Sequence, residues 1–176
     1  IVHPCSSLKI RNWGIENFAL LCRNLIVEDD IQIIIICSPQ ETDSIVPIKT
    51  LAPGIRVIAS SFRELLGVIN ECDLFIGNDS GPSHFSVALN VPTITLFGPT
   101  PSNFYHDRYL FRDAHYSFNK DVPCRDLFLT QCMSKRDPIT KQPSCDEMSC
   151  LAFSVDEVVD KARELLKIKK FKVPIS

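Results

Sequence analysis

The residues with the clearest chemical potential lie in one short run, residues 78–84, where an apolar segment gives way to Asn-Asp-Ser-Gly-Pro-Ser-His. Pro82 suits the first turn of a helix, because that position needs no N–H donor and proline fixes φ near the helical value. The unpaired N–H groups of a first helical turn, together with the helix dipole, attract phosphate or carboxylate groups. This run therefore predicts an anion-binding turn that joins a strand to a helix.

The elements that must position this turn follow an alternating pattern. Apolar and β-branched runs indicate strands at residues 1–3, 31–37, 55–58, 73–76 and 92–96. Between them, apolar residues at helical spacing predict helices that begin near residues 13, 40, 61 and 82, with Pro47 interrupting the second. The pairs Ser61/Glu64 and Ser154/Glu157 have the spacing of capping boxes. Strands that alternate with helices predict an α/β fold with a doubly wound parallel sheet.

In such a sheet the carboxyl ends of all strands point to one edge, where open α/β sheets bind ligands. The loops expected at that edge contain Ser6, Ser7 and Arg11, then Glu41, and then Asp79, Ser80, Gly81, Pro82 and His84. Hydroxyls, a guanidinium group, carboxylates and free helix N–H groups together suit a phosphate-bearing ligand with a ribose. Each residue alone is equally well explained as a cap, a turn residue or a solvated side chain. Their convergence on one edge favours a binding site.

Composition limits the classes of function. The 176-residue chain has a net charge of −2, which argues against a nucleic-acid partner held by bulk electrostatics. Its apolar runs are far shorter than the roughly 20 residues of a membrane span. Eight cysteines without a visible export signal indicate reduced thiols. Because the chain begins at Ile1 within a strand pattern, we expect a further segment to precede it.

Several segments resemble the signature of bacterial lipopolysaccharide heptosyltransferases (ADP-heptose:LPS heptosyltransferase, glycosyltransferase family 9). They are residues 78–84, Ala-Leu-Asn-Val-Pro at 88–92 and Leu-Phe-Gly-Pro-Thr at 96–100. In addition, His-Pro-x-Ser-Ser at 3–7 and Arg-Asn-Trp at 11–13 are similar to the opening of that family's carboxyl-terminal domain. The resemblance covers most of residues 1–100. It implies a Rossmann-like domain that forms the carboxyl-terminal half of a GT-B glycosyltransferase, in which two such halves face a cleft.

The resemblance also implies a function. Residues 1–176 would form the donor-binding domain of an inverting, cytoplasmic glycosyltransferase that needs no metal or other cofactor. The donor would be ADP-heptose or a similar nucleotide sugar, and the acceptor the lipopolysaccharide inner core. The amino-terminal acceptor domain, which carries the catalytic base, would be absent from this chain. We therefore expect no catalytic residue within it and no activity of the fragment alone.

By position, the same resemblance assigns roles to the predicted site residues. The diphosphate and the neighbouring sugar would be held by Asp79, Ser80 and Gly81, with His84 beside the diphosphate. Glu41 would reach the nucleotide ribose. Arg11 stands where the family usually has a lysine that neutralises phosphate charge, and its planar fork differs from an ammonium group.

Two alternatives stay open. A sugar-nucleotide 2-epimerase of the same two-domain architecture would share the Asp-Ser-Gly turn, although Pro82 stands where those enzymes have a second glycine. A nucleotide-binding module without catalysis would fit the lack of an evident acid–base pair in this chain. A nicotinamide-binding domain is disfavoured, since no Gly-x-Gly-x-x-Gly follows the first strand.

The segment at about 101–153 interrupts the alternation, and we predict an irregular excursion over the domain surface. It contains four cysteines, and their spacing does not match the paired CxxC of a zinc ribbon; they are Cys124, Cys132, Cys145 and Cys150. Zinc ligation, disulfides and free thiols all stay open, with free thiols favoured. A closing helix is expected at about 154–170. Its basic end at 167–172 allows either peripheral contact with the inner membrane or, as we favour, a solvated helix terminus.

Overall fold

One parallel sheet organises the chain. The computed structural model describes residues 1–29, 31–102, 114–124, 138–139 and 145–167. Six strands, all paired in parallel, lie in the order β3-β2-β1-β4-β5-β6. Their bounds are β1 Val2–His3, β2 Ile34–Cys37, β3 Arg56–Ala59, β4 Phe75–Asn78, β5 Thr93–Phe97 and β6 His115–Asn119. The predicted α/β fold with a doubly wound parallel sheet is confirmed.

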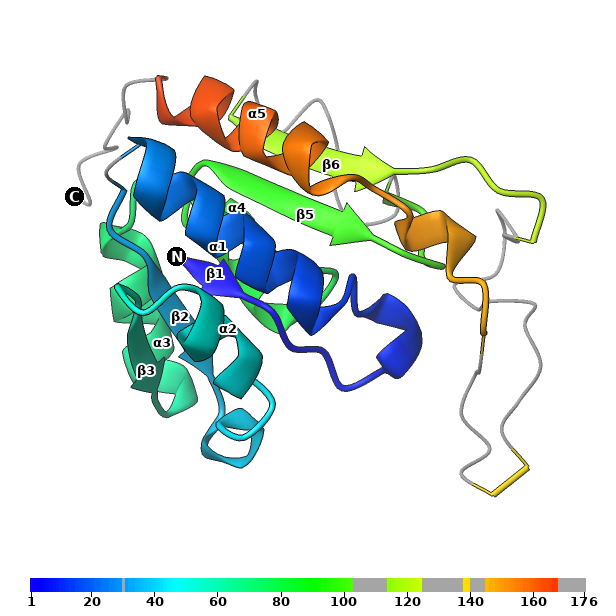
Figure 1. Ribbon diagram of the computed structural model, residues 1–176, viewed down its shortest axis with the longest axis horizontal. Helices are drawn as coiled ribbons and strands as arrows, with labels where there is room; N and C mark the ends of the chain where they lie inside the picture. Colours follow the sequence, from blue (N-terminus) through cyan, green and yellow to red (C-terminus); the bar gives the residue numbers. More distant parts are fainter. Residues whose placement is uncertain (30, 103–113, 125–137, 140–144, 168–176) are drawn as a thin grey trace.

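Helices cover both faces of this sheet. Their bounds are α1 Ile15–Asp29, α2 Val46–Leu51, α3 Phe62–Glu71, α4 Gly81–Ala88 and α5 Val155–Leu166, with short 3₁₀-helices at Lys9–Arg11, Pro39–Glu41 and Ser149–Leu151. Helices α1 and α5 lie side by side in front of the strands in Figure 1, and α4 lies behind them. The larger core packs under α1, α2 and α5, while a smaller one joins α3 to the opposite face.

Local sequence signals set most of the helix boundaries. The Glu64 carboxylate accepts a hydrogen bond from the Ser61 backbone N–H at 3.0 Å, and Glu157 does the same for Ser154 at 2.7 Å. Both predicted capping boxes are therefore present. After α4 the chain turns at Asn90, whose φ of 56° is the left-handed conformation that asparagine tolerates.

The prediction that Pro47 interrupts a helix is wrong. Residues 39–41 form a separate 3₁₀ turn, and Pro47 lies in the first turn of α2. A proline is tolerated there because the first N–H groups of a helix have no intrahelical acceptor.

The prediction of an irregular excursion at about 101–153 is wrong in one part. Strand β6 lies within that segment and pairs in parallel with β5 along its whole length, from Thr93↔His115 to Phe97↔Asn119. The closing helix is confirmed as α5, which ends at Leu166; residues 168–176, including most of the basic end, lie outside the described residues.

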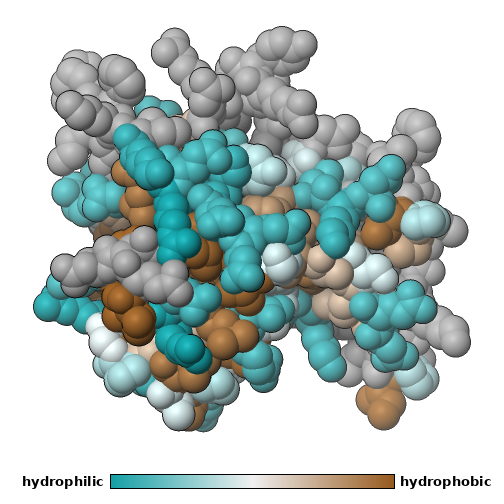
Figure 2. Space-filling view, turned by 45° about the horizontal axis from the view of Figure 1, so that its top comes forward, coloured by the Kyte–Doolittle hydropathy of each residue, from teal (hydrophilic) through white to brown (hydrophobic). Residues whose placement is uncertain are grey.

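In the view of Figure 2, the hydrophobic residues of the described part of the chain appear in groups separated by hydrophilic ones. The six large hydrophobic side chains that are exposed in the described part of the chain are Leu20 and Val27 in α1, Val46 and Leu51 in α2, Tyr116 in β6, and Ile139. Among the described helices, none combines the length and the apolar character needed to cross a membrane.

Candidate functional site

The strand order places two loops at a switch point. From β1 the chain winds outward through β2 to β3, and then returns to add β4 on the other side of β1. Strands β1 and β4 are therefore neighbours at the point where the winding reverses, and the loops that follow them begin side by side. In open α/β sheets this is where a crevice forms at the carboxyl ends of the strands and where ligands bind.

Asn78, the last residue of β4, ties these two loops together. Its side chain is fully buried, and its amide oxygen accepts a hydrogen bond from the Trp13 backbone N–H at 3.0 Å. Its amide nitrogen donates to the Pro4 carbonyl at 2.8 Å and to Asn12 Oδ1 at 3.2 Å. Since these partners lie at both ends of the β1 loop, one side chain fixes the course of that loop beside β4.

The clamped loop brings three of the predicted site residues into one cluster. Asp79 Oδ2 lies 3.5 Å from Arg11 Nε, and Asp79 Oδ1 lies 3.2 Å from His84 Nε2. The Asp79 side chain is 1% exposed, whereas those of Arg11 and His84 are 26% and 32% exposed. The carboxylate is thus the inner member of the cluster, and the guanidinium and imidazole groups are its solvent-facing members.

The cluster keeps Asp79 ionised. Burial acts to raise the pKa of its carboxyl group, but the His84 imidazole, the Arg11 guanidinium and the Thr100 hydroxyl outweigh burial and hold that pKa below its usual range. A buried carboxylate is stable in this state only when opposite charge or hydrogen-bond donors lie close to it. Arg11 therefore faces the edge of the sheet as a cation held in a fixed place.

Helix α4 starts beside this cluster. Ser80 is its N-cap residue, and Gly81 and Pro82 form its first turn. The Ser80 backbone N–H donates to Ser83 Oγ at 3.3 Å, and the Ser83 hydroxyl donates back to the Ser80 carbonyl at 2.7 Å. The Ser83 and His84 N–H groups donate to the Ser80 carbonyl, and Pro82 has no N–H. The first turn therefore offers the Gly81 N–H and the positive end of the helix dipole to an anion at this edge.

The other predicted residues lie nearby without joining the cluster. Ser6 Oγ accepts a hydrogen bond from the Leu8 backbone N–H at 3.5 Å, and Ser7 is exposed. Glu41, in the loop after β2, accepts a hydrogen bond from the Ser38 backbone N–H at 2.8 Å. Within the described part of the chain, no recorded hydrogen bond or ion pair connects these three side chains to Asp79.

The cysteines give no support to a metal site. Cys124 is exposed, Cys145 is half-buried, Cys150 is buried, and Cys132 lies outside the described residues. Among the residues that the structure describes, no group of three or more His, Cys, Asp or Glu side chains could hold a metal ion. Closer to the site, burial raises the pKa of Cys5 to about 12, with Glu41 and Cys37 adding to the effect, so Cys5 stays a neutral thiol.

Two residues at this edge were not assigned a role from sequence. Asn78 belongs to the motif at residues 78–84, but only the fold shows that it clamps the β1 loop. His3 belongs to the motif at residues 3–7, and in the fold its Nδ1 lies 3.3 Å from Ser80 Oγ. The two residues share one sequence pattern that indicates a functional role: each is a polar residue at the carboxyl end of an otherwise apolar strand.

Fold and site together define the class of this domain: a Rossmann-like α/β domain whose switch-point loops bring a guanidinium group, an imidazole group and a helix start to one edge of the sheet. Comparison with known proteins then identifies the family. The sequence pattern of glycosyltransferase family 9 (heptosyltransferase) matches residues 1–137, so the chain belongs to this family.

Individual relatives agree. The chain is 34% identical over 109 residues to lipopolysaccharide heptosyltransferase 1 of Campylobacter coli, covering 58% of this chain and 32% of the relative. Among solved structures, E. coli ADP-heptose lps heptosyltransferase II superposes with a TM-score of 0.68 at 18% identity, covering 94% of this chain and 45% of that one. E. coli heptosyltransferase WaaC with ADP gives a TM-score of 0.63 at 20% identity, covering 93% and 43%. The chain thus spans less than half the length of these relatives.

Proposed function

We propose that this chain is the donor-binding domain of an inverting glycosyltransferase that transfers heptose from ADP-heptose to the lipopolysaccharide inner core. The observation that carries the proposal is the cluster of Arg11, Asp79 and His84 beside the start of α4. It offers a fixed guanidinium, the Gly81 N–H and the positive end of the α4 dipole to a diphosphate at the switch point of the sheet. Membership of the heptosyltransferase family supports the choice of reaction.

The roles within the site follow from exposure and charge. Arg11 would pair with the diphosphate, and the Gly81 N–H would donate to the same diphosphate. His84, half-exposed beside Asp79, would contact the diphosphate from the helix side. Glu41 would accept a hydrogen bond from a ribose hydroxyl while it keeps its contact with Ser38. Ser6 and Ser7 would line the near side of the pocket.

The acceptor and the catalytic base belong, in this proposal, to an amino-terminal domain outside these residues. The solved relatives support this division, because the chain covers only 45% of heptosyltransferase II. Purified as 176 residues, the chain is therefore expected to transfer no heptose to a lipopolysaccharide acceptor in a radiolabel or coupled ADP-release assay. Turnover above the no-protein background would contradict the assignment of the base to the other domain.

The direct test is calorimetric titration of the chain with ADP-heptose, ADP, UDP and NAD in parallel. We expect the two ADP compounds to bind more tightly than UDP and NAD. A preference for UDP would favour the epimerase-like alternative. Binding of ADP by a full-length protein that shows no turnover would favour a nucleotide-binding module.

Two matched carboxylate variants locate the site. Asp79→Ala removes the anion that holds Arg11 and His84, so we expect it to weaken ADP-heptose binding by about tenfold or more, the effect of losing one charge-assisted contact. Glu64→Ala removes an exposed carboxylate whose contacts are with Ser61 in its own capping box. It should loosen a cap and leave ligand affinity unchanged. Equal losses of affinity in the two variants would argue against the assigned site.

A further inference from the structure

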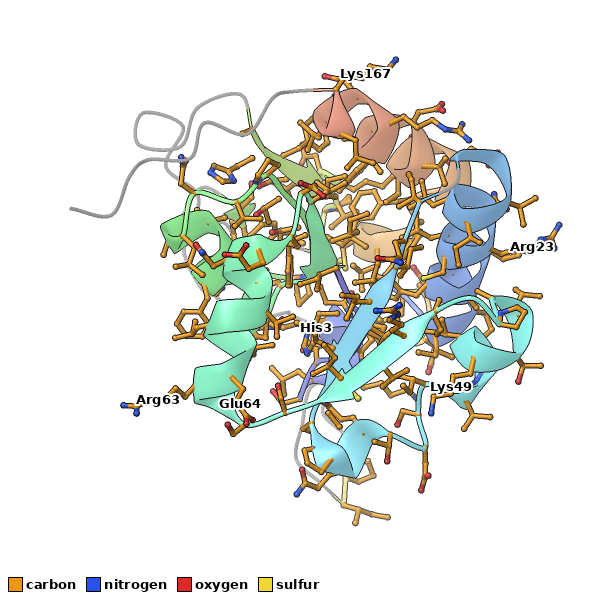
Figure 3. The ribbon with its side chains drawn as sticks, turned by 90° about the vertical axis from the view of Figure 1, so that its left-hand side faces the viewer. His3, Arg23, Lys49, Arg63, Glu64 and Lys167 are labelled. Carbon is orange, nitrogen blue, oxygen red and sulfur yellow. The ribbon has the colours of Figure 1, made fainter. Side chains whose placement is uncertain are left out.

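His3 lies at the centre of the binding edge without an assigned role. It is the last residue of β1 and pairs in register with Gly77 of β4, and it is 8% exposed. Figure 3 shows His3 in the interior, whereas the labelled Arg23, Arg63 and Lys167 extend outward. A Cβ atom on Gly77 would lie 3.4 Å from His3 Cβ and 3.0 Å from the His3 carbonyl oxygen. Because Gly77 has no Cβ atom, His3 can lie against β4 without a clash.

The His3 ring contacts the N-cap residue of α4. His3 Nδ1 lies 3.3 Å from Ser80 Oγ, and the Ser80 hydroxyl donates to the Asn78 carbonyl at 3.2 Å. Burial lowers the pKa of His3 to about 4, although the Glu41 carboxylate acts in the opposite direction. The imidazole is thus neutral at neutral pH and carries one N–H.

These contacts favour one arrangement of the protons. A serine hydroxyl has one proton and two lone pairs, and the shorter contact, 3.2 Å, directs the Ser80 proton to the Asn78 carbonyl. The contact with His3 is then favourable only if Nδ1 carries the ring proton and donates it to Ser80 Oγ. One lone pair of Ser80 stays available on its half-buried side chain, and this atom can accept a hydrogen bond but has no proton to offer a phosphate oxygen.

We propose that His3 is a positioning residue that holds the Ser80 hydroxyl as an acceptor for an O–H group of the donor sugar. The proposal rests on the function proposed above and refines it. Phosphate oxygens, which only accept hydrogen bonds, are left to Arg11 and the Gly81 N–H. Ser80 then distinguishes a nucleotide sugar from the free nucleotide.

Substitutions at His3 separate positioning from simple packing. The amide nitrogen of asparagine falls near the place of Nδ1, and that of glutamine near the place of Nε2. His3→Asn should therefore retain ADP-heptose affinity, whereas His3→Gln and Ser80→Ala should each weaken it about tenfold, as expected for one lost hydrogen bond in a pocket. Affinity for ADP should stay within about twofold of the unmodified chain in the two His3 variants, because ADP offers no sugar hydroxyl at this point.

The double variant His3→Gln/Ser80→Ala tests whether His3 acts through Ser80. If it does, the double variant binds ADP-heptose no more weakly than Ser80→Ala alone, since the two substitutions remove one shared interaction. Additive losses, equal losses for ADP and ADP-heptose, or a His3→Asn variant as weak as His3→Gln would overturn the proposal. His115→Gln serves as the folding control, because His115 is a partly buried histidine at the amino end of β6, away from this edge.

A second measurement needs no ligand. Long-range ¹H–¹⁵N correlation spectra at neutral pH distinguish the two neutral tautomers of an imidazole, and we expect the Nδ1–H form for His3. Finding the Nε2–H form would overturn the proposed role of His3. If the unmodified chain binds neither ADP nor ADP-heptose, the proposed function and the sugar contact are both overturned. The tautomer of His3 would still show whether His3 holds Ser80.

Discussion

Replacement of Asn78 by alanine should both destabilise the fold and detach the loop that carries Arg11. The substitution removes the acceptor of the Trp13 N–H and the donor to the Pro4 carbonyl, two backbone contacts made inside the protein. Each buried backbone group left without a partner costs about 1–3 kcal/mol. The third lost contact, to the partly buried Asn12, is replaceable by water. We therefore expect a loss of about 3 kcal/mol, which lowers the melting temperature by about 6–12 °C in a domain of this size.

The assay is urea denaturation followed by circular dichroism and by tryptophan fluorescence. Trp13 is the single tryptophan of the chain and is 4% exposed, so its emission reports directly on the clamped loop. The urea midpoint should fall, while the slope of the free energy of unfolding against urea concentration stays unchanged, as expected when only stability changes. ADP affinity should fall as well, because Arg11 loses its fixed position.

Asn70→Ala is the matched control. The Asn70 side chain lies in α3 and donates to the exposed Glu71 at 3.1 Å, so its loss should change stability by no more than about 0.5 kcal/mol. A midpoint for Asn78→Ala that equals that of the control would refute the reasoning, because the buried contacts would then contribute nothing measurable.

Two further predictions concern acid stability and glycine packing. Burial lowers the pKa of His3 and of His115 from 6.5 to about 4, so below pH 6.5 the unfolded chain binds protons that the folded chain does not. The contribution of these histidines to the free energy of unfolding should be complete above that pH and fall as the pH drops toward 4, by up to about 3 kcal/mol for His3. Urea midpoints measured across this pH range check the prediction. A His3→Asn variant whose stability falls with pH as steeply as that of the unmodified chain would contradict it. Gly98→Ala should cost about 1–3 kcal/mol, because the new Cβ would lie 3.0 Å from the Ile10 carbonyl oxygen. Gly67→Ala, whose Cβ would meet no atom within 4 Å in the middle of α3, should instead stabilise the chain by about 0.5–1 kcal/mol, and thermal melts that give both variants the same sign would count against the packing argument.

Strand β6 shows where sequence patterns were insufficient. Its residues, His-Tyr-Ser-Phe-Asn, alternate polar and aromatic side chains and lack the continuous apolar run of β2. As an edge strand it pairs on one side, and Tyr116 is partly exposed. The formation of such a strand depends on its neighbouring strand more than on its own composition. The sequence pattern alone therefore predicts an irregular segment at this position.

Pro47 and Asp79 show the same limit at single residues. A proline ends one helix or begins another according to where the preceding turn stops, and that depends on the 3₁₀ turn at Pro39–Glu41. For Asp79, the sequence indicated a polar group beside an anion site and left open what neutralises it. The neutralising partners come from the β1 loop and from α4, and only their positions in the folded chain show that Asp79 is the buried member of the cluster.

By itself the sequence determined the local features: the alternation of strands and helices, the capping boxes at Ser61 and Ser154, the left-handed turn at Asn90, and a helix that starts at Gly81 with Pro82 in its first turn. These depend on residues within a few positions of one another, so local propensity and hydrogen bonding suffice to predict them. The order of the strands was decided only by the tertiary structure, because parallel pairing joins segments far apart in the chain. That order sets Asn78 against Trp13, 65 residues away, and so brings Arg11 to Asp79.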